Sequence, residues 1–280
     1  MKLVRYGPPG REKPGLIDDH GTLRDLSSVT PHLDLPTLGA AGVARLARLD
    51  AAKLPEVRGR RRLGVPFTGI SKFVGIGLNY VDHAAEAGMR VPTEPIVFMK
   101  ATTCIAGPDD PIVLPEGSTQ TDWEVELGVV IGRVARRVSE AQALEHVCGY
   151  CVVNDVSERE WQTKRGGTWD KGKGFDGFGP IGPWLVSRDE VPDPQSLSLW
   201  LDVNGAPKQR GSTSKMVFGV AQLVSYVSRC MTLLPGDVIA TGTPPGVGMG
   251  IKPTPQFLKA GDVVELGIDG LGRQRQRIVG

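Results

Sequence analysis

The chain has 280 residues, 40% of them hydrophobic, so it can bury a full core as one large domain or as one large and one small domain. Its 33 basic and 31 acidic residues give a formal net charge of +2 without long runs of either sign, which argues against nucleic acid or an anionic membrane as a partner. No apolar stretch approaches the ~20 residues that span a bilayer, and the N-terminus lacks the apolar core of a signal peptide, so we expect a soluble cytoplasmic protein.

Residues 1–70 show no pattern that indicates chemistry, and we expect them to form a small leading domain. Short strands separated by Pro, Gly and Asp turns are predicted at residues 3–6, 15–17 and 22–26. Apolar residues at helical spacing predict one short amphipathic helix over residues 42–54. The basic cluster at residues 58–62 is too short to argue for RNA binding, so we interpret it as a solvated connector.

A strand is predicted at residues 72–78, followed by a short helix or ordered loop over residues 79–88. On a helical turn His83 and Glu86 lie on one face, because they are three residues apart, and a histidine oriented by a carboxylate can act as a general base. The alternative is an exposed helix with an incidental histidine. A zinc-binding HxxEH motif is excluded because Ala87 follows Glu86.

Two carboxylates lie on the same face of the next long strand, over residues 121–132. Side chains alternate along a strand, so Glu124 and Glu126 project together. A second apolar strand ends on Asp155, just before a predicted helix N-cap at Ser157. Three carboxylates at strand ends without His or Cys are typical of a site for Mg²⁺, Mn²⁺ or Ca²⁺. The alternative is a solvated strand face.

The remaining chain is predicted to alternate between loops and strands. Residues 158–182 are rich in charge, Trp and Gly, and we interpret them as an ordered loop that lines a site. A hairpin turns at Asn204-Gly205 and carries Gln209 on its return strand. A helix is expected at residues 216–233, and the loop at 241–248 offers hydroxyl and backbone N–H groups to an anion. Further strands are predicted at residues 95–100, 112–114, 238–240, 262–268 and 273–279.

Two other motifs carry no function in this interpretation. Gly75-Ile76-Gly77 begins like a dinucleotide-binding fingerprint, but Tyr80 stands where the third glycine belongs. Cys148 and Cys151 have the spacing of a redox or metal pair, yet they lie in an apolar segment without a second pair. We therefore expect two buried thiols.

Five motifs together resemble the fumarylacetoacetate hydrolase family: IGLNYxDHxxExG, DWEVELGVVIG, GYxVxNDVSER, KGKGFDxFGPIGP and LxPGDVIxTGTPPGVG. The resemblance covers residues 72–280. The leading residues are similar to a bacterial branch commonly labelled ureidoglycolate lyase or 2,4-diketo-3-deoxy-L-fuconate (or L-rhamnonate) hydrolase. The resemblance implies an α+β, mainly β fold, with a mixed β-sandwich roll over residues 71–280, a small N-terminal α+β domain over residues 1–70, and a homodimer.

The resemblance also implies roles for individual residues. The implied ligands of Mg²⁺, with Mn²⁺ or Ca²⁺ as alternatives, are Glu124, Glu126 and Asp155. The implied catalytic residues are His83 and Glu86, on a lid that orders over the site when substrate binds, and Lys173, near the metal. The implied substrate-binding residues are Tyr80, Gln209 and Thr243, the last through the substrate carboxylate.

The function that we expect is Mg²⁺-dependent hydrolysis of a carbon–carbon bond in a 2,4-dioxo acid, also called an acylpyruvate. The branch implies a 2,4-diketo-3-deoxy sugar acid that gives pyruvate and a hydroxy acid. The same metal site could serve an oxaloacetate-type decarboxylase, an isomerase or a ureidoglycolate lyase. An alternative of another class is a non-catalytic, metal-dependent dicarboxylate-binding protein, which would have no need of a base at His83.

Overall fold

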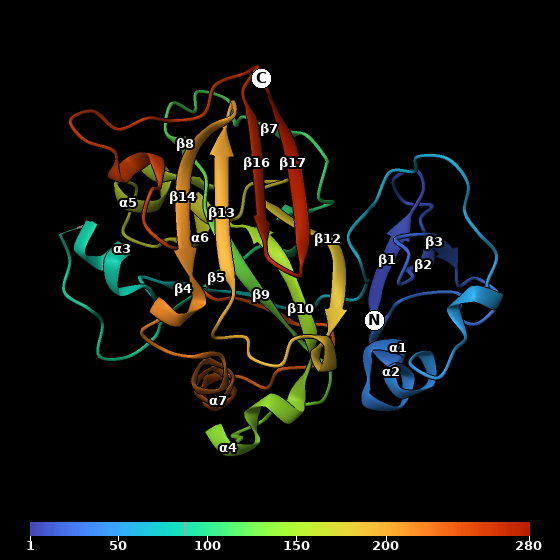
Figure 1. Cartoon of the computed structure of the whole chain (residues 1–280). Coiled ribbons are helices and arrows are strands. Elements are labelled where there is room, and N and C mark those ends of the chain that lie inside the picture. The colour runs from blue at the N-terminus through green and yellow to red at the C-terminus, as the bar shows by residue number, and fades with distance from the viewer. Residues whose placement is uncertain (87) are drawn as a thin grey trace.

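The computed structural model describes residues 1–86 and 88–280, and strands dominate its architecture (Figure 1). The larger sheet has the order β3-β2-β1-β12-β10-β9-β15-β4-β5, and β6 pairs with β12 off this path. Its strands are β1 Lys2–Tyr6, β2 Lys13–Ile17, β3 Leu23–Asp25, β4 Phe73–Gly77, β5 Ile96–Lys100, β6 Ile105–Ala106, β9 Val125–Ile131, β10 Val147–Asn154, β12 Gly179–Ser187 and β15 Val238–Ala240. Strands β9 and β10 are buried at every position, as expected of strands covered on both faces.

A second, smaller sheet packs against β9 and β10 and completes the core (Figure 1). It has the order β14-β13-β16-β17-β7. Its strands are β7 Ile112–Val113, β13 Ser198–Val203, β14 Ala206–Ser212, β16 Val263–Ile268 and β17 Gly272–Val279. Buried and exposed positions alternate along β13 and β17, so this sheet has one face toward the core and one toward solvent. A short ladder joins β8 Thr121–Asp122 to β11 Ser157–Glu158.

The helices are short and lie around the edges of the sheets. They are α1 Leu35–Leu38, α2 Ala40–Leu46, α3 Val81–Glu86, α4 Glu140–Ala143, α5 Arg159–Thr163, α6 Asp170–Lys173 and α7 Val220–Cys230. The longest, α7, packs beside α4 at one end of the molecule and buries an apolar stripe that includes Leu223, Val224 and Val227 (Figure 1).

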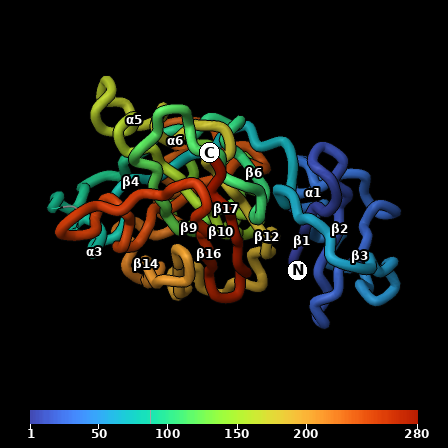
Figure 2. The backbone as a smooth tube through the Cα atoms, turned by 90° about the horizontal axis from the view of Figure 1, so that it is seen from above, coloured from blue at the N-terminus to red at the C-terminus, as the bar shows by residue number. Residues whose placement is uncertain are grey.

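The N-terminal strands extend the large sheet, although the first helices and strands form a lobe at one side of the molecule (Figures 1 and 2). Strand β1 pairs antiparallel with β12, with Lys2 opposite Val186 and Leu3 opposite Leu185. Main-chain hydrogen bonds therefore continue across the boundary that the sequence places at residue 70, and that boundary stays a prediction.

The mainly β fold and most of its strands are confirmed, but five local predictions need correction. The single strand predicted at 121–132 is divided into β8 and β9, with Trp123 and Glu124 between them. Ser157 is not a helix N-cap: it pairs in β11, and α5 begins two residues later. The segment at residues 158–182 forms α5, α6 and the start of β12 rather than one loop. The helix predicted at 216–233 is limited to α7, because Gly219 has extended backbone angles at its N-terminus. The helix predicted at 42–54 spans only α2 and a later single turn at Ala51–Lys53.

The cysteine pair behaves as predicted. Cys148 and Cys151 lie in β10 as free, buried thiols, and burial raises the pKa of each to about 12. A thiol with such a pKa is protonated at neutral pH and is neither a good nucleophile nor a good metal ligand.

None of the helices in the described residues combines the length and the apolarity needed to cross a membrane.

Candidate metal centre and active site

Three buried carboxylates meet where β9 and β10 pair. Glu124 directly precedes β9, Glu126 is its second residue, and Asp155 directly follows β10. The antiparallel register sets Glu126 opposite Val153, and the Asp155 amide donates to the Glu124 carbonyl at 2.9 Å. One oxygen from each carboxylate lies within 4.8 Å of the other two. The structure therefore brings together the three residues that the sequence proposes as metal ligands.

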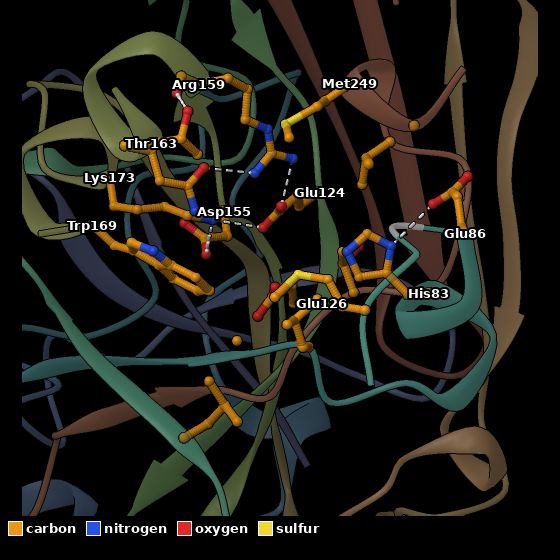
Figure 3. A pocket seen from close by; sticks show the side chains of 18 of the residues that line it. His83, Glu86, Glu124, Glu126, Asp155, Arg159, Thr163, Trp169, Lys173 and Met249 are labelled. Carbon is orange, nitrogen blue, oxygen red and sulfur yellow. Dashed lines mark hydrogen bonds and ion pairs between the residues drawn. The ribbon is translucent and has the colours of Figure 1, made fainter. Parts of the chain in front are cut away.

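Three cations compensate part of this negative charge, and two of them, Lys173 and Arg159, are labelled in Figure 3. The Lys173 ammonium donates to Glu124 Oε2 and to Asp155 Oδ2, both at 2.7 Å. Lys100 donates to Asp155 Oδ1 at 2.6 Å, and Arg159 Nη2 donates to Glu124 Oε1 at 2.6 Å. Lys100 and Arg159 cannot be predicted from the sequence, because nothing local marks a lysine inside β5 or an arginine after β11 as a partner of these carboxylates.

Glu126 receives the least compensation of the three carboxylates. Within the described residues it makes one hydrogen bond, from the Gly242 amide at 2.8 Å, and no ion pair. Burial, together with the charges of Asp155 and Glu124, raises the pKa of Glu126 well above its ordinary value. Burial would also raise the pKa of Glu124, but the charges of Lys173 and Arg159 outweigh it and hold that pKa below its usual range.

This donor set fits a divalent cation of the Mg²⁺ or Mn²⁺ type. All three side chains offer oxygen, and hard cations prefer carboxylate oxygen over nitrogen or sulfur. The buried Glu126 carboxylate also needs positive charge in order to remain ionised, which a bound cation would supply. Glu124, Glu126 and Asp155 would hold such an ion.

The predicted general base His83 and its partner Glu86 lie in the same cavity as the carboxylates, which has a volume of about 220 Å³ (Figure 3). His83 and Glu86 belong to α3, and His83 Nδ1 lies 3.0 Å from Glu86 Oε2. The other Glu86 oxygen accepts from the Gly246 amide at 2.9 Å. Helix α3 ends at Glu86; the predicted helix or loop runs to Gly88, and its Ala87 lies outside the described residues. Because Glu86 binds both His83 and the Gly246 amide, it connects the histidine to the loop after β15.

The other walls of the cavity are largely apolar. Trp169 packs against Phe98 with ring centroids 5.6 Å apart, and a Cβ atom on Gly77 would lie only 2.3 Å from the Trp169 ring. Met89 and Met249 also line the cavity and are about half exposed, so they flank its opening. Apart from Lys252, near Met249, the charged groups that line the cavity are on the floor and on α3.

The three residues proposed for substrate binding have different positions. Thr243 lines the cavity, but its hydroxyl donates to the Val125 carbonyl and accepts from Gln209 Nε2. Gln209 is fully buried and also accepts from the Val125 amide. Tyr80 is fully buried, and its hydroxyl has no hydrogen-bond partner among the described residues. Contact of these residues with substrate stays a prediction.

The loop after β15 gives its backbone donors to carboxylates of the chain itself. Gly242 donates to Glu126 and Gly246 to Glu86, while the amides of Gly248 and Met249 donate to Asp122. The sequence predicts that this loop offers N–H groups to an anion. The anions that it binds in this structure are side chains on three other segments, and nothing in the sequence marks Asp122 as one of them.

Comparison with known proteins agrees with the motifs. The family model described as "Fumarylacetoacetate (FAA) hydrolase C-terminal" matches residues 72–279. A protein from Burkholderia multivorans, named provisionally as a hydrolase, is 66% identical over 276 residues, which cover 99% of this chain and 98% of the relative. A relative from Burkholderia cenocepacia with a similar provisional name has the same identity and coverage.

Several solved structures span the whole of this chain, and three of them illustrate their range. The fumarylacetoacetate hydrolase of Exiguobacterium antarcticum is 36% identical, with a TM-score of 0.87 and 99% of its chain covered. A 2-hydroxyhepta-2,4-diene-1,7-dioate isomerase from Mycobacterium marinum is 35% identical, with a TM-score of 0.77 and 98% covered. The maleylpyruvate hydrolase of a Sphingobium species, solved with manganese(II) and pyruvate, is 26% identical, with a TM-score of 0.82 and 99% covered. The chain therefore belongs to the fumarylacetoacetate hydrolase family.

Proposed function

We propose that the protein is a divalent-metal-dependent hydrolase that cleaves the C3–C4 bond of an acylpyruvate and releases pyruvate. The observation that carries the proposal is the shared cavity: three carboxylates suited to Mg²⁺ form its floor, and an oriented His83–Glu86 pair forms its opposite wall. A neighbour of the same fold, the maleylpyruvate hydrolase, was solved with manganese(II) and pyruvate, which supports this substrate class.

The metal would be held by Glu124, Glu126 and Asp155. When bound, it would act as a Lewis acid toward the 1-carboxylate and 2-oxo oxygens of the substrate. The remaining chemistry belongs to side chains that line the cavity.

His83 is positioned to take a proton from water. Glu86 accepts a hydrogen bond from Nδ1, which leaves Nε2 as the basic nitrogen facing the cavity. The water oxygen bonds to C4, the C3–C4 bond breaks, and its electron pair stays on the three-carbon fragment as pyruvate enolate. The proton that His83 took from water is then delivered to C3, which gives pyruvate and restores the neutral histidine. The Lys173 ammonium, fixed between two carboxylates, stabilises the negative charge that develops.

The acyl group of the substrate is the part that the resemblance alone suggests. A 2,4-diketo-3-deoxy sugar acid is our proposed natural substrate, with lactate or a similar hydroxy acid as the second product. We also propose Mg²⁺ as the native metal and a homodimer as the assembly.

An isomerase is the second candidate, and it is favoured by the isomerase of Mycobacterium marinum among the structural neighbours. Isomerisation moves a proton between carbons, so it needs a base but no attacking water. Incubation with Mg²⁺ and acetylpyruvate, maleylpyruvate, a 2,4-diketo-3-deoxy sugar acid, oxaloacetate or ureidoglycolate, followed by product analysis, separates these functions. Pyruvate together with the matching acid is the expected result. Metal binding without any product would favour the non-catalytic binding protein and contradict our proposal.

A further inference from the structure

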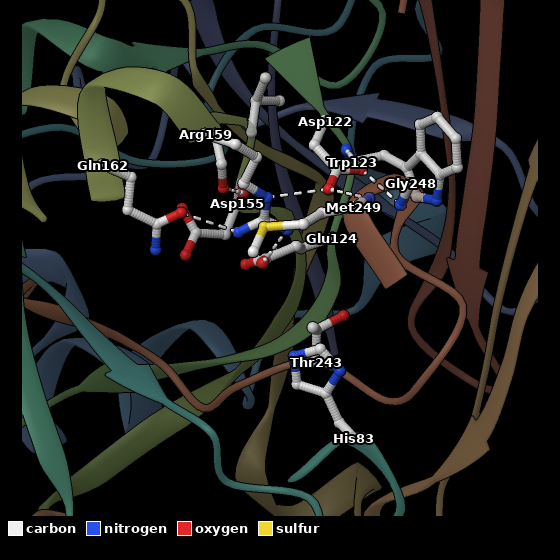
Figure 4. Close-up of polar contacts among 12 residues, drawn as sticks. His83, Asp122, Trp123, Glu124, Asp155, Arg159, Gln162, Thr243, Gly248 and Met249 are labelled. Atoms are coloured by element: carbon white, nitrogen blue, oxygen red, sulfur yellow. Dashed lines mark hydrogen bonds and ion pairs between the residues drawn. The ribbon is translucent and has the colours of Figure 1, made fainter. Parts of the chain in front are cut away.

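A buried carboxylate outside the cavity gathers four donors from three segments (Figure 4). Asp122, the last residue of β8, is fully buried. Its Oδ1 accepts from the amides of Trp123 at 2.8 Å and Gly248 at 2.7 Å. Its Oδ2 accepts from the Met249 amide at 3.0 Å and from Arg159 Nε at 2.8 Å. Both carboxylate oxygens are therefore fully used.

One side of this arrangement leads to the metal floor. Arg159 is buried and divides its guanidinium between three acceptors: Nε binds Asp122, Nη1 binds Gln162 at 2.9 Å, and Nη2 binds Glu124 at 2.6 Å. Because the guanidinium is planar and rigid, the bond to Asp122 fixes the direction of the bond to Glu124. Asp122 thereby influences a proposed metal ligand without touching it.

The other side of the Asp122 hydrogen-bond arrangement leads to His83 and Glu86. The loop segment 246–250 is bound to Asp122 through the Gly248 and Met249 amides, and to Glu86 through the Gly246 amide. This segment approaches both carboxylates so closely that side chains would not fit. A Cβ atom on Gly248 would lie 2.7 Å from Asp122 Oδ1, and one on Gly250 would lie 2.6 Å from Glu86 Cδ.

We propose that Asp122 is a positioning residue that fixes the His83 and Glu86 side chains and the Glu124 metal ligand in one relative geometry. It acts through the 246–250 backbone on one side and through Arg159 on the other. The inference rests on the proposed function for its catalytic consequence. The geometry itself also predicts changes in metal affinity and in hydrogen exchange of α3, and both can be measured without turnover.

The test variant is Asp122→Asn. An amide has one acceptor oxygen, so its NH₂ group must face two N–H donors on one side of the residue. Without the Asp122 charge, the Arg159 charge acts on Glu124 alone and competes with a bound cation. We expect the dissociation constant of Mn²⁺, measured by calorimetry, to rise about tenfold, within the range for residues that orient metal ligands. We also expect faster hydrogen exchange of α3 and of residues 246–250 in the oxalate complex.

Asp237→Asn is the matched control. Asp237 is also fully buried and accepts from the Ser71 hydroxyl and from the Lys72 and Leu234 amides, with the Lys72 ammonium 2.8 Å away, but these bonds reach neither Arg159 nor segment 246–250. This variant should lower the thermal midpoint as much as Asp122→Asn does and leave Mn²⁺ affinity and α3 exchange as in the parent protein. If both variants change the two readouts equally, or if Asp122→Asn changes neither, the positioning role is refuted.

Gly250→Ala provides a second test that does not depend on folding of the Asp122 variant. The three atoms nearest the added methyl group all belong to the Glu86 carboxylate, so exchange of α3 should increase while the Mn²⁺ dissociation constant stays within about twofold. Gly39→Ala, at a site where the nearest atom is 3.5 Å from the new Cβ, is its control.

If the parent protein cleaves no acylpyruvate, the proposed function fails, yet Mn²⁺ affinity and hydrogen exchange of α3 still decide the role of Asp122.

Discussion

His83 has the geometry of a base, and its removal separates two reactions. Hydrolysis needs activated water, whereas decarboxylation of oxaloacetate needs only the metal and a cation near the developing enolate. His83→Ala should therefore reduce acylpyruvate hydrolysis by about 10²-fold or more and affect oxaloacetate decarboxylation much less. Glu86→Gln should follow the same pattern more mildly. The two rates are measured in one buffer at one Mg²⁺ concentration, with the exposed His20→Ala as control. Unchanged acylpyruvate hydrolysis in His83→Ala would exclude the histidine as the base.

Lys173 should matter to both reactions, because both pass through an enolate. Its ammonium lies between Glu124 and Asp155, so Lys173→Met removes charge from the floor of the cavity. We expect both rates to fall by at least tenfold. Lys171→Met is the matched control: it removes the same charge from an exposed position in the same helix. A selective loss of hydrolysis alone would contradict the role given to Lys173.

At the scale of elements, α3 should respond when a small molecule such as oxalate binds to the metal. A helix that closes a cavity against water must move away to admit substrate, and its contact with the rest of the chain includes the bond from Glu86 to the Gly246 amide. Oxalate or pyruvate, in the presence of Mg²⁺, should slow hydrogen exchange over residues 79–92. Exchange that is equally slow with and without oxalate would show that α3 does not act as a lid.

The sequence predicted the strands with local signals and missed those without them. The β-branched runs of β9 and β10 and the Asn204-Gly205 hairpin are all where they were expected. Strand β12 was missed because Pro180 and Pro183 interrupt its pattern, yet it pairs with both β1 and β10. Prolines and glycines usually indicate loops, and only the pairing with β1, β6 and β10 makes this segment a strand.

For the site, the motifs predicted the acidic triad and the HxxE pair, and the structure brings them into one cavity. Lys100, Asp122 and Arg159 could not be identified in the same way, because each meets its partner only after strands distant in sequence have paired. Their charges are ordinary in a chain with 64 charged residues, 33 basic and 31 acidic, so burial is the property that distinguishes them.

At the scale of the whole molecule, metal removal should affect both activity and stability. EDTA should abolish turnover, and Mg²⁺ or Mn²⁺ should restore it. Because the cation would bind only the folded site, Mn²⁺ at about 100 times its dissociation constant should stabilise the protein by about 2.7 kcal/mol. For a chain of this size, that corresponds to a rise of roughly 5 °C in the thermal midpoint. Full turnover in EDTA would disprove the metal site.

The N-terminal residues should be needed for folding of the remainder. A chain that begins at residue 71 lacks β1, so the β12 main chain becomes an exposed sheet edge. We expect residues 71–280 expressed alone to aggregate, whereas the full chain unfolds in a single calorimetric transition. A soluble fragment with the thermal midpoint of the full chain would instead show that residues 1–70 are an independent domain.

The alternation of glycines in segment 246–250 separates two kinds of evolutionary change. The amides of Gly246 and Gly248 donate to Glu86 and Asp122, and Gly250 packs against Glu86, while the intervening Val247 and Met249 line the cavity. Mutation at the two intervening positions can therefore alter which acyl groups fit without disturbing the backbone donors. A library randomised at Val247 and Met249 alone should yield folded, metal-binding proteins with diverse substrate preferences, so this loop is the natural starting point for directed evolution of a new specificity.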